Sequence, residues 1–174
     1  MILAIDTSQM TYSIAFNDQL IEWQDIQISL YDQLCDVNLN DLSGIMVNIG
    51  PGRFSGLRSG IAFAQGLAQA KQVPLYAVSS FEVVASKIQD TSFTIALDAR
   101  KDEAYIQAFS QGKPGDIQLV SQSSLTDTSL LYGNISHSQI ITTNAKSMLH
   151  MAQSIALKAT ALNAIEPIYI RSSV

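Results

Sequence analysis

A glycine-rich hinge between a short apolar run and a long helical segment constrains this chain more than any other stretch. The apolar run covers residues 44–49, the hinge is Gly50-Pro51-Gly52, and the helical pattern extends over residues 55–71. Glycine reaches positive φ without a Cβ clash and proline fixes φ near −65°, so a strand can turn sharply into a helix here. Ser55 is a suitable N-cap, and the first-turn amides of such a helix favour an anion. The hinge therefore predicts a strand–turn–helix unit, whose loop is either a structural turn or an anion site.

The hinge matches neither of the two common phosphate-binding signatures. The nucleotide-triphosphate loop needs Gly-Lys-Ser or Gly-Lys-Thr after its first glycine, whereas Arg53 and Phe54 follow Gly52 here. The dinucleotide motif G-x-G-x-x-G needs its third glycine one residue before Gly56. These mismatches favour the structural turn. An anion site at this turn would use residues of the hinge and of the turn after the first strand: Asp6, Thr7, Ser8, Gly50, Gly52, Ser55 and Arg58.

Small residues recur on one face of the helix that follows the hinge. An interior glycine costs a helix about 0.5–1 kcal/mol relative to alanine, so these residues are better explained by the close approach of another backbone. That backbone belongs either to the chain's own sheet or to a helix of a second chain, and the length of the stripe slightly favours the second chain. The stripe consists of Gly56, Ser59, Gly60, Ala64 and Ala68. The partner surface predicted from this helix consists of Gly56, Ser59, Gly60, Phe63, Ala64 and Leu67.

Both halves of the chain show the same order of expected strands. An apolar run that ends in Asp6 is followed by an alternating segment, a turn and a third short strand. The same order begins again in the second half, where the apolar run ends in Asp98. We therefore expect an α/β fold of two related lobes, residues 1–90 and residues 91–174, with the second lobe reduced. Residues 144–162 predict a helix, and the last residues predict an edge strand.

Composition and spacing argue against several kinds of function. The net charge is −5 and the ten basic residues are scattered, so the chain is poorly suited to holding nucleic acid by itself. His137 and His150 have no second histidine at helical spacing, so no metal site is predicted. No Gly-x-Ser-x-Gly elbow is present, and we predict no catalytic residue.

The cysteine content and the hydropathy pattern bear on the compartment. Cys35 is the only cysteine, so no disulfide can form within the chain. We expect this thiol in a packed core and the chain in the reducing cytosol. The opening residues do not follow a signal-peptide pattern, and no window is apolar over about 18 residues. The expected location is therefore cytoplasmic, without membrane contact.

Four sequence blocks together resemble the signature of one bacterial family. They are Ile2–Ser8, the hinge Gly50–Arg58 with Gly60-Ile61 and Ala64–Ala68, the segment Ile95–Tyr105, and Glu166–Arg171. Their order is that of the TsaB (YeaZ) family, and they span nearly the whole chain. The chain therefore resembles the TsaB (YeaZ) family, a paralogue of TsaD.

The resemblance implies an actin/Hsp70/sugar-kinase (ASKHA) fold and a role without chemistry of its own. TsaB-like proteins are scaffold subunits in the addition of threonylcarbamoyl to N6 of the adenosine next to the anticodon of tRNA. The resemblance implies pairing with a catalytic TsaD-like subunit through helices of the first lobe, and recruitment of a TsaE-like ATPase near their junction. It also implies that tRNA is bound only through the complex. No cofactor is required, and ATP or ADP would sit at the subunit junction.

Two other functions fit the sequence. The first is a self-associating binding protein, which forms a homodimer through the same small-residue helix when no other partner is present. The second is a nucleotide-binding ATPase of the same superfold. Full phosphate loops in both lobes would favour the ATPase, and this sequence shows at most one such loop.

Overall fold

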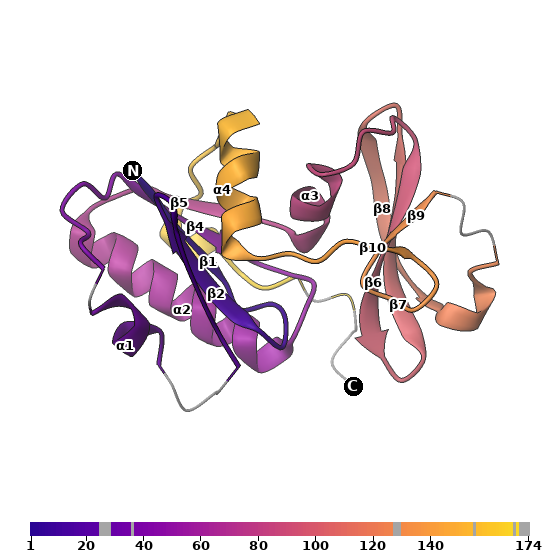
Figure 1. Ribbon diagram of the computed structural model, residues 1–174, viewed down its shortest axis with the longest axis horizontal. Helices are drawn as coiled ribbons and strands as arrows, with labels where there is room; N and C mark the ends of the chain where they lie inside the picture. Colours follow the sequence, from indigo (N-terminus) through magenta and orange to yellow (C-terminus); the bar gives the residue numbers. More distant parts are fainter. Residues whose placement is uncertain (25–28, 36, 127–129, 155, 169, 171–174) are drawn as a thin grey trace.

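Two five-stranded sheets dominate the computed structural model (Figure 1). The structure describes residues 1–174 except 25–28, 36, 127–129, 155, 169 and 171–174. The first sheet forms one lobe with the helices packed on it, and the second sheet forms the other lobe. Within the described residues, no helix is both long and apolar enough to cross a membrane.

The first sheet has the strand order β3-β2-β1-β4-β5. Strand β1 lies at the centre of the sheet, where it pairs antiparallel with β2 and parallel with β4. Both central strands are almost entirely buried, as their continuous apolar runs predict for strands covered on both faces. The strands are β1 (Ile2–Asp6), β2 (Tyr12–Phe16), β3 (Gln19–Trp23), β4 (Gly44–Asn48) and β5 (Leu75–Val78).

The second sheet repeats this topology. Its order is β10-β9-β6-β7-β8, and β6 pairs antiparallel with β7 and parallel with β9, as β1 does with β2 and β4. The fold is thus α/β and ASKHA-like, with the same strand order in both lobes. The strands are β6 (Phe93–Arg100), β7 (Glu103–Ser110), β8 (Lys113–Ser121), β9 (Leu131–Gly133) and β10 (Gln139–Ile140). The second lobe is reduced because a short loop, residues 134–138, replaces the long helix that joins β4 to β5.

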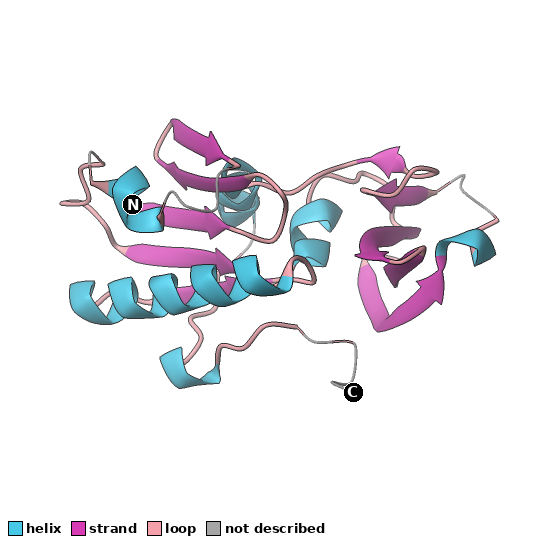
Figure 2. Ribbon diagram, turned by 90° about the horizontal axis from the view of Figure 1, so that it is seen from below, coloured by secondary structure: helices cyan, strands magenta, loops and turns pink. Residues whose placement is uncertain are grey.

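Helices cover both faces of the first sheet. Figure 2 shows the long helix α2 running beside the strands, with α1 near it. Helix α4 packs on the opposite face against β1 and β2. Helix α3 lies between the sheets, with Val83 against the first and Phe81 and Val84 against the second. The helices are α1 (Leu30–Leu34), α2 (Phe54–Lys71), α3 (Ser80–Ala85) and α4 (Ala145–Ser154), with 3₁₀ turns η1 (Gln122–Ser124) and η2 (Leu162–Ala164).

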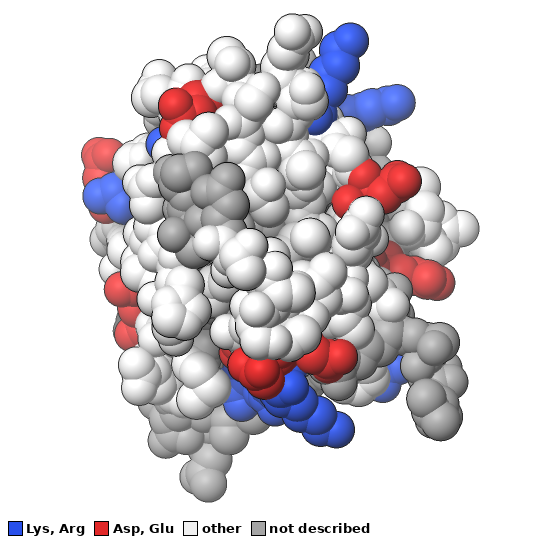
Figure 3. Space-filling model, turned by 90° about the vertical axis from the view of Figure 1, so that its right-hand side faces the viewer, with Lys and Arg blue, Asp and Glu red and all other residues white. Residues whose placement is uncertain are grey.

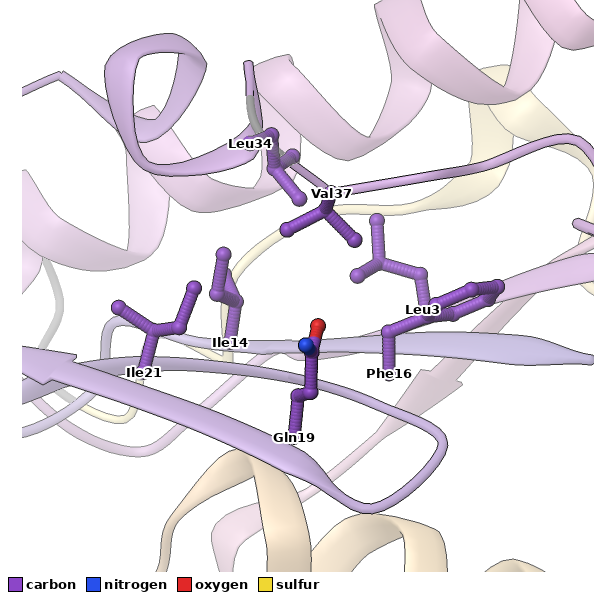
Figure 4. Close-up of a pocket in the computed structure, with 7 residues that line it drawn as sticks. All are labelled: Leu3, Ile14, Phe16, Gln19, Ile21, Leu34 and Val37. Carbon is purple, nitrogen blue, oxygen red and sulfur yellow. The ribbon is translucent and has the colours of Figure 1, made fainter.

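Helix α1 closes the core on the α2 side of the sheet. Ser29 caps it in a capping box with Asp32, and Leu34 is buried beneath it. A cavity of about 10 Å³ remains between α1 and the sheet (Figure 4), which is barely the size of one water molecule. Its walls are Leu3, Ile14, Phe16, Gln19, Ile21, Leu34 and Val37. Cys35 follows at the C-cap and is exposed, so its expected place in a packed core was wrong.

The end of the chain returns to the first lobe. The Ala145 amide donates to Ser13 Oγ of β2 over 2.9 Å, and Met148 and Met151 enter the core of the first lobe. Farther on, the amide of Thr160 donates to the carbonyl of Leu75 over 2.8 Å, and Ile165 is buried near α2. The division at residue 90 stays a prediction, but these contacts argue for grouping residues 144–154 and 156–168 with the first lobe.

One expectation about this end of the chain needs correction. The helix expected over residues 144–162 stops at Ser154, and residues 156–168 continue as an extended segment with one 3₁₀ turn. Residues 165–168 are not a strand, and the edge strand expected for the last residues falls mostly outside the described part of the chain.

Helix α2 approaches the end of β1 unusually closely. A Cβ placed on Gly56 would lie 2.2 Å from the Thr7 carbonyl oxygen, and one placed on Gly60 would lie 2.2 Å from Thr7 Oγ1. The Thr7 hydroxyl donates to the Gly56 carbonyl over 2.8 Å. The small residues of this face therefore serve the chain's own sheet. Gly66 is different, because nothing lies within 4 Å of a Cβ placed there.

The turn between β6 and β7 has an unusual backbone. Arg100, Lys101 and Asp102 have φ values of 63°, 53° and 59°, so three consecutive non-glycine residues are left-handed. This conformation costs an ordinary residue about 1–2 kcal/mol. The turns before β3 and β8 also use left-handed residues, but they include Asn17 or Gly112, which accept that conformation more readily.

A matched pair of glycine substitutions tests the close approach of α2. Gly60→Ala should lower the free energy of unfolding by about 1–3 kcal/mol, because its methyl group overlaps Thr7. Gly66→Ala should raise it by about 0.5–1 kcal/mol, because it gains helix propensity without a clash. Urea unfolding followed by circular dichroism measures both. Equal effects of the two substitutions would contradict the packing described here.

Candidate functional site

The glycine hinge is fixed to the turn after β1. Gly50 has a φ of 100°, and its peptide bond to Pro51 is cis. The Arg53 amide donates to the Ser8 carbonyl over 2.8 Å, and a Cβ on Gly52 would lie 2.5 Å from that same oxygen. Only glycine allows this contact. Helix α2 begins at Phe54, so Arg53 rather than the expected Ser55 is the N-cap, and its side chain makes no capping hydrogen bond there.

Asn48, at the end of β4, is the hub of the loop. Its Oδ1 accepts from the Gly50 amide over 2.8 Å and from Ser80 Oγ over 3.1 Å. Its Nδ2 donates to Ser8 Oγ over 3.3 Å. Asn48, Ser8 and Ser80 are all buried. The start of α2, the turn after β1 and the start of α3 are therefore joined through one amide side chain.

Asp6 lies buried beside this hub. Its Oδ1 accepts from the Ser8 amide over 2.9 Å and from Ser8 Oγ over 2.6 Å. Its Oδ2 is also buried and has no hydrogen-bond partner within the part of the chain that the structure describes. Lys87 Nζ donates to the Thr142 carbonyl over 2.7 Å, joining the two segments that cross between the lobes. Burial lowers the pKa of Lys87, and the charge of Asp6 opposes this with a smaller upward effect.

The residues of the predicted anion site do not all converge. Asp6, Thr7, Ser8, Gly50 and Gly52 lie together, but their polar groups are engaged within the fold. Ser8 binds Asp6, the Thr7 hydroxyl donates to the Gly56 carbonyl, and the Gly50 amide donates to Asn48. Ser55 is exposed, and the Arg58 guanidinium lies over the Phe54 ring at 4.5 Å from its centroid. The contacts agree with a structural turn, and the anion site stays a prediction.

The predicted partner surface divides into two groups. Gly56, Gly60 and Ala64 are buried against the chain's own sheet, so another chain cannot approach them there. Ser59 is exposed, and Phe63 and Leu67 are half-buried. Helix α2 has a second small-residue stripe that the sequence analysis missed, although its spacing of three and four residues is visible in the sequence. This exposed stripe consists of Ser55, Ser59, Ala62, Gly66 and Ala70.

The described residues do not form a metal centre. No group of three or more His, Cys, Asp or Glu side chains among them could hold a metal ion. His150 instead lines an open groove of about 310 Å³ between α4 and the start of β1, beside Lys146 and Asp18.

Comparison with known proteins identifies the family. The family model of TsaD, tRNA N6-adenosine threonylcarbamoyltransferase, matches residues 29–165, which is most of the chain. The chain belongs to this family. Its relatives include the tRNA threonylcarbamoyladenosine biosynthesis protein TsaB of Escherichia coli, 29% identical over 137 residues. The protein of the same name in Bacillus subtilis is 34% identical over 122 residues. The resemblance to the TsaB (YeaZ) family is thus confirmed.

The aligned region is only part of these relatives. It covers 66% of this chain and 57% of the Escherichia coli protein, and 60% of this chain and 52% of the Bacillus subtilis protein. The chain therefore spans little more than half the length of the curated relatives it matches. YeaZ from Pseudomonas aeruginosa has a similar fold, with a TM-score of 0.67 and 21% identity over 97% of this chain and 99% of that one. At that identity the likeness supports the fold alone.

Removal of the Asn48 side chain tests its role as the hub. Asn48→Ala leaves the buried Gly50 amide without its acceptor, so the free energy of unfolding should fall by about 1–3 kcal/mol. Asn163→Ala changes an exposed residue of η2 and should stay within about 0.5 kcal/mol of the wild type. Thermal unfolding of both variants measures the difference. A fully stable Asn48→Ala protein would show that the loop holds without this amide.

Proposed function

We propose that this chain is a non-catalytic, activating subunit of the complex that adds threonylcarbamoyl to N6 of the adenosine next to the anticodon in tRNA. Its partner is a TsaD-like catalytic subunit, and tRNA is bound only through the complex. Family membership and the names of the TsaB relatives support this role. The exposed small-residue stripe of α2 is the structural observation that carries the proposal.

The exposed stripe allows a second helix to pack closely against α2. Ala62, Gly66 and Ala70 are exposed and project at most a methyl group, so another helix axis can approach closely. Phe63 and Leu67 are half-buried beside the stripe and add apolar area. Phe54 is 56% exposed at the start of the same helix. The partner surface is therefore assigned to the outer side of α2, away from β1.

We also propose that this subunit catalyses no chemical step itself. The polar side chains around the hinge bind one another, which supports a structural turn rather than a reaction centre. Catalysis is assigned to the TsaD-like subunit, and a TsaE-like ATPase joins near the junction. ATP or ADP, where it binds, would lie at that junction.

The same surface accounts for self-association. Without its partner, the exposed stripe leaves small and apolar side chains in water, and a second copy of the chain would cover them. We therefore propose a homodimer for the isolated chain. It would compete with the TsaD-like subunit for α2.

An arginine on the outer side of α2 tests the partner surface. Ala62→Arg places a long charged side chain on the exposed stripe without touching the core, and binding to the TsaD-like subunit should weaken at least tenfold. Tenfold corresponds to about 1.4 kcal/mol. Co-purification and calorimetry measure binding, and threonylcarbamoylation of a tRNA transcript by the reconstituted complex should fall with it.

The control variant carries an alanine-to-arginine substitution on the second lobe. Ala108 is exposed on β7, so Ala108→Arg should leave binding and modification unchanged. If a folded Ala62→Arg protein bound the TsaD-like subunit normally, the result would show that α2 is not the partner surface. Failure of the wild-type chain to bind would contradict the scaffold role itself.

A further inference from the structure

The turn between β6 and β7 retains an unfavourable backbone where glycine would relieve it. Arg100, Lys101 and Asp102 are all left-handed, and none of them is a glycine or an asparagine. Residues held in sparsely populated backbone regions cluster at functional sites, where their side chains are needed. The side chains of Arg100 and Lys101, which glycine lacks, are therefore candidates for a binding function.

Gln122 holds this turn rigidly from the start of η1. Its amide donates to the Asp102 carbonyl over 2.8 Å. Its Nε2 donates to the Glu103 carbonyl over 3.1 Å and to Asp98 Oδ1 over 3.3 Å. The Arg100 amide also donates to Asp98 Oδ1, over 3.0 Å. The surrounding structure thus fixes the backbone from which the Arg100 and Lys101 side chains project.

The two cationic side chains are available to a partner. Arg100 and Lys101 are both exposed, and within the described residues neither side chain forms a hydrogen bond or an ion pair. The nearby carboxylates are partly engaged, because Asp98 Oδ1 accepts two hydrogen bonds and Glu103 is half-buried with partners of its own. Asp102 is the exposed carboxylate that remains in this turn. The turn therefore carries two unpaired positive charges and one exposed negative charge.

The rest of the chain offers little competition for an anionic partner. Arg100 and Lys101 are the only neighbouring pair of basic residues in the sequence, and residues 1–52 contain no Lys or Arg. Figure 3 looks at the second-lobe side of the molecule, where Lys and Arg side chains stand in a few separate groups around the rim of a mostly uncharged face. The phosphate groups of a nucleic acid therefore have few other basic side chains on this protein to bind.

We propose that Arg100 and Lys101 form a preorganised contact for phosphate groups of the tRNA backbone in the assembled complex. The proposal rests on the function proposed above. A guanidinium group binds phosphate through two parallel hydrogen bonds, and an ammonium group adds a compact charge. Contacts of this kind fix the register of a nucleic acid without reading its sequence. The second lobe would thus help to position a tRNA whose main binding surface lies on the catalytic partner.

The salt dependence of tRNA binding tests this contact. The complex is reconstituted from this chain and its TsaD-like partner, and the affinity for a tRNA transcript is measured between 50 and about 200 mM salt. With both Arg100→Gln and Lys101→Gln, the slope of log affinity against log salt should fall by about 1.4–1.8, as for two lost phosphate contacts. Lys113→Gln, which neutralises an exposed lysine at the next hairpin, should leave the slope unchanged.

A glycine variant separates the phosphate contact from a purely structural role of the turn. Lys101→Gly should raise the unfolding temperature, because glycine accepts the left-handed conformation, and it should still reduce the slope by about 0.7–0.9. A more stable Lys101→Gly protein with an unchanged slope would overturn the proposal.

The remaining outcomes distinguish this contact from the complex itself. If the wild-type complex modifies tRNA and the double variant binds it with the same slope, the phosphate contact is wrong and the scaffold role stands. If the double variant loses assembly instead, the turn contacts a protein surface, which also overturns the phosphate contact. If the wild-type chain forms no complex, the scaffold role fails, and this inference fails with it.

Discussion

The close approach of helix α2 to the end of β1 determines the arrangement of the first lobe. Gly56 and Gly60 leave no room for a side chain between the helix and Thr7, so α2 lies nearly in backbone contact with the sheet. The Thr7 hydroxyl completes this contact by binding the Gly56 carbonyl. Because one small-residue face of α2 is used in this way, only the opposite small-residue face stays exposed.

Internal duplication explains why similar polar side chains occur in both lobes. Asp6 Oδ1 accepts from the amide two residues later at the end of β1, and Asp98 Oδ1 does the same near the end of β6. Asn48 accepts from the Gly50 amide after β4, and Asn134 accepts from the Asp98 amide after β9. The two lobes diverged in what these turns support. The first carries a long helix after its Asn, whereas the second carries a short loop.

Much of the fold could be predicted because it follows local patterns. Continuous apolar runs identified the two central strands of the first sheet. The repeated strand order predicted the second sheet. The prediction was weakest where local pattern carries little information. Strands β9 and β10 are too short to show a period, and the helix beginning at Ala145 ends at Ser154 although its apolar spacing continues.

The site was harder to predict because glycine and alanine do not reveal which side of a helix they face. Both stripes of α2 are small, and only the three-dimensional contacts show that Gly60 meets Thr7 whereas Gly66 meets nothing. The hub at Asn48 was missed for a related reason. A single asparagine at a strand end has no pattern, and its partners Ser8 and Ser80 are distant in sequence.

The return of the chain to the first lobe affects how the protein is made. Ala145, Met148, Met151 and Ile165 complete cores whose other buried members precede residue 85. A ribosome that has synthesised the first sheet has therefore not yet supplied the side chains that cover it. The second lobe must emerge before the first can close, and until then the face of β1 and β2 beneath α4 stays open to water or to a chaperone.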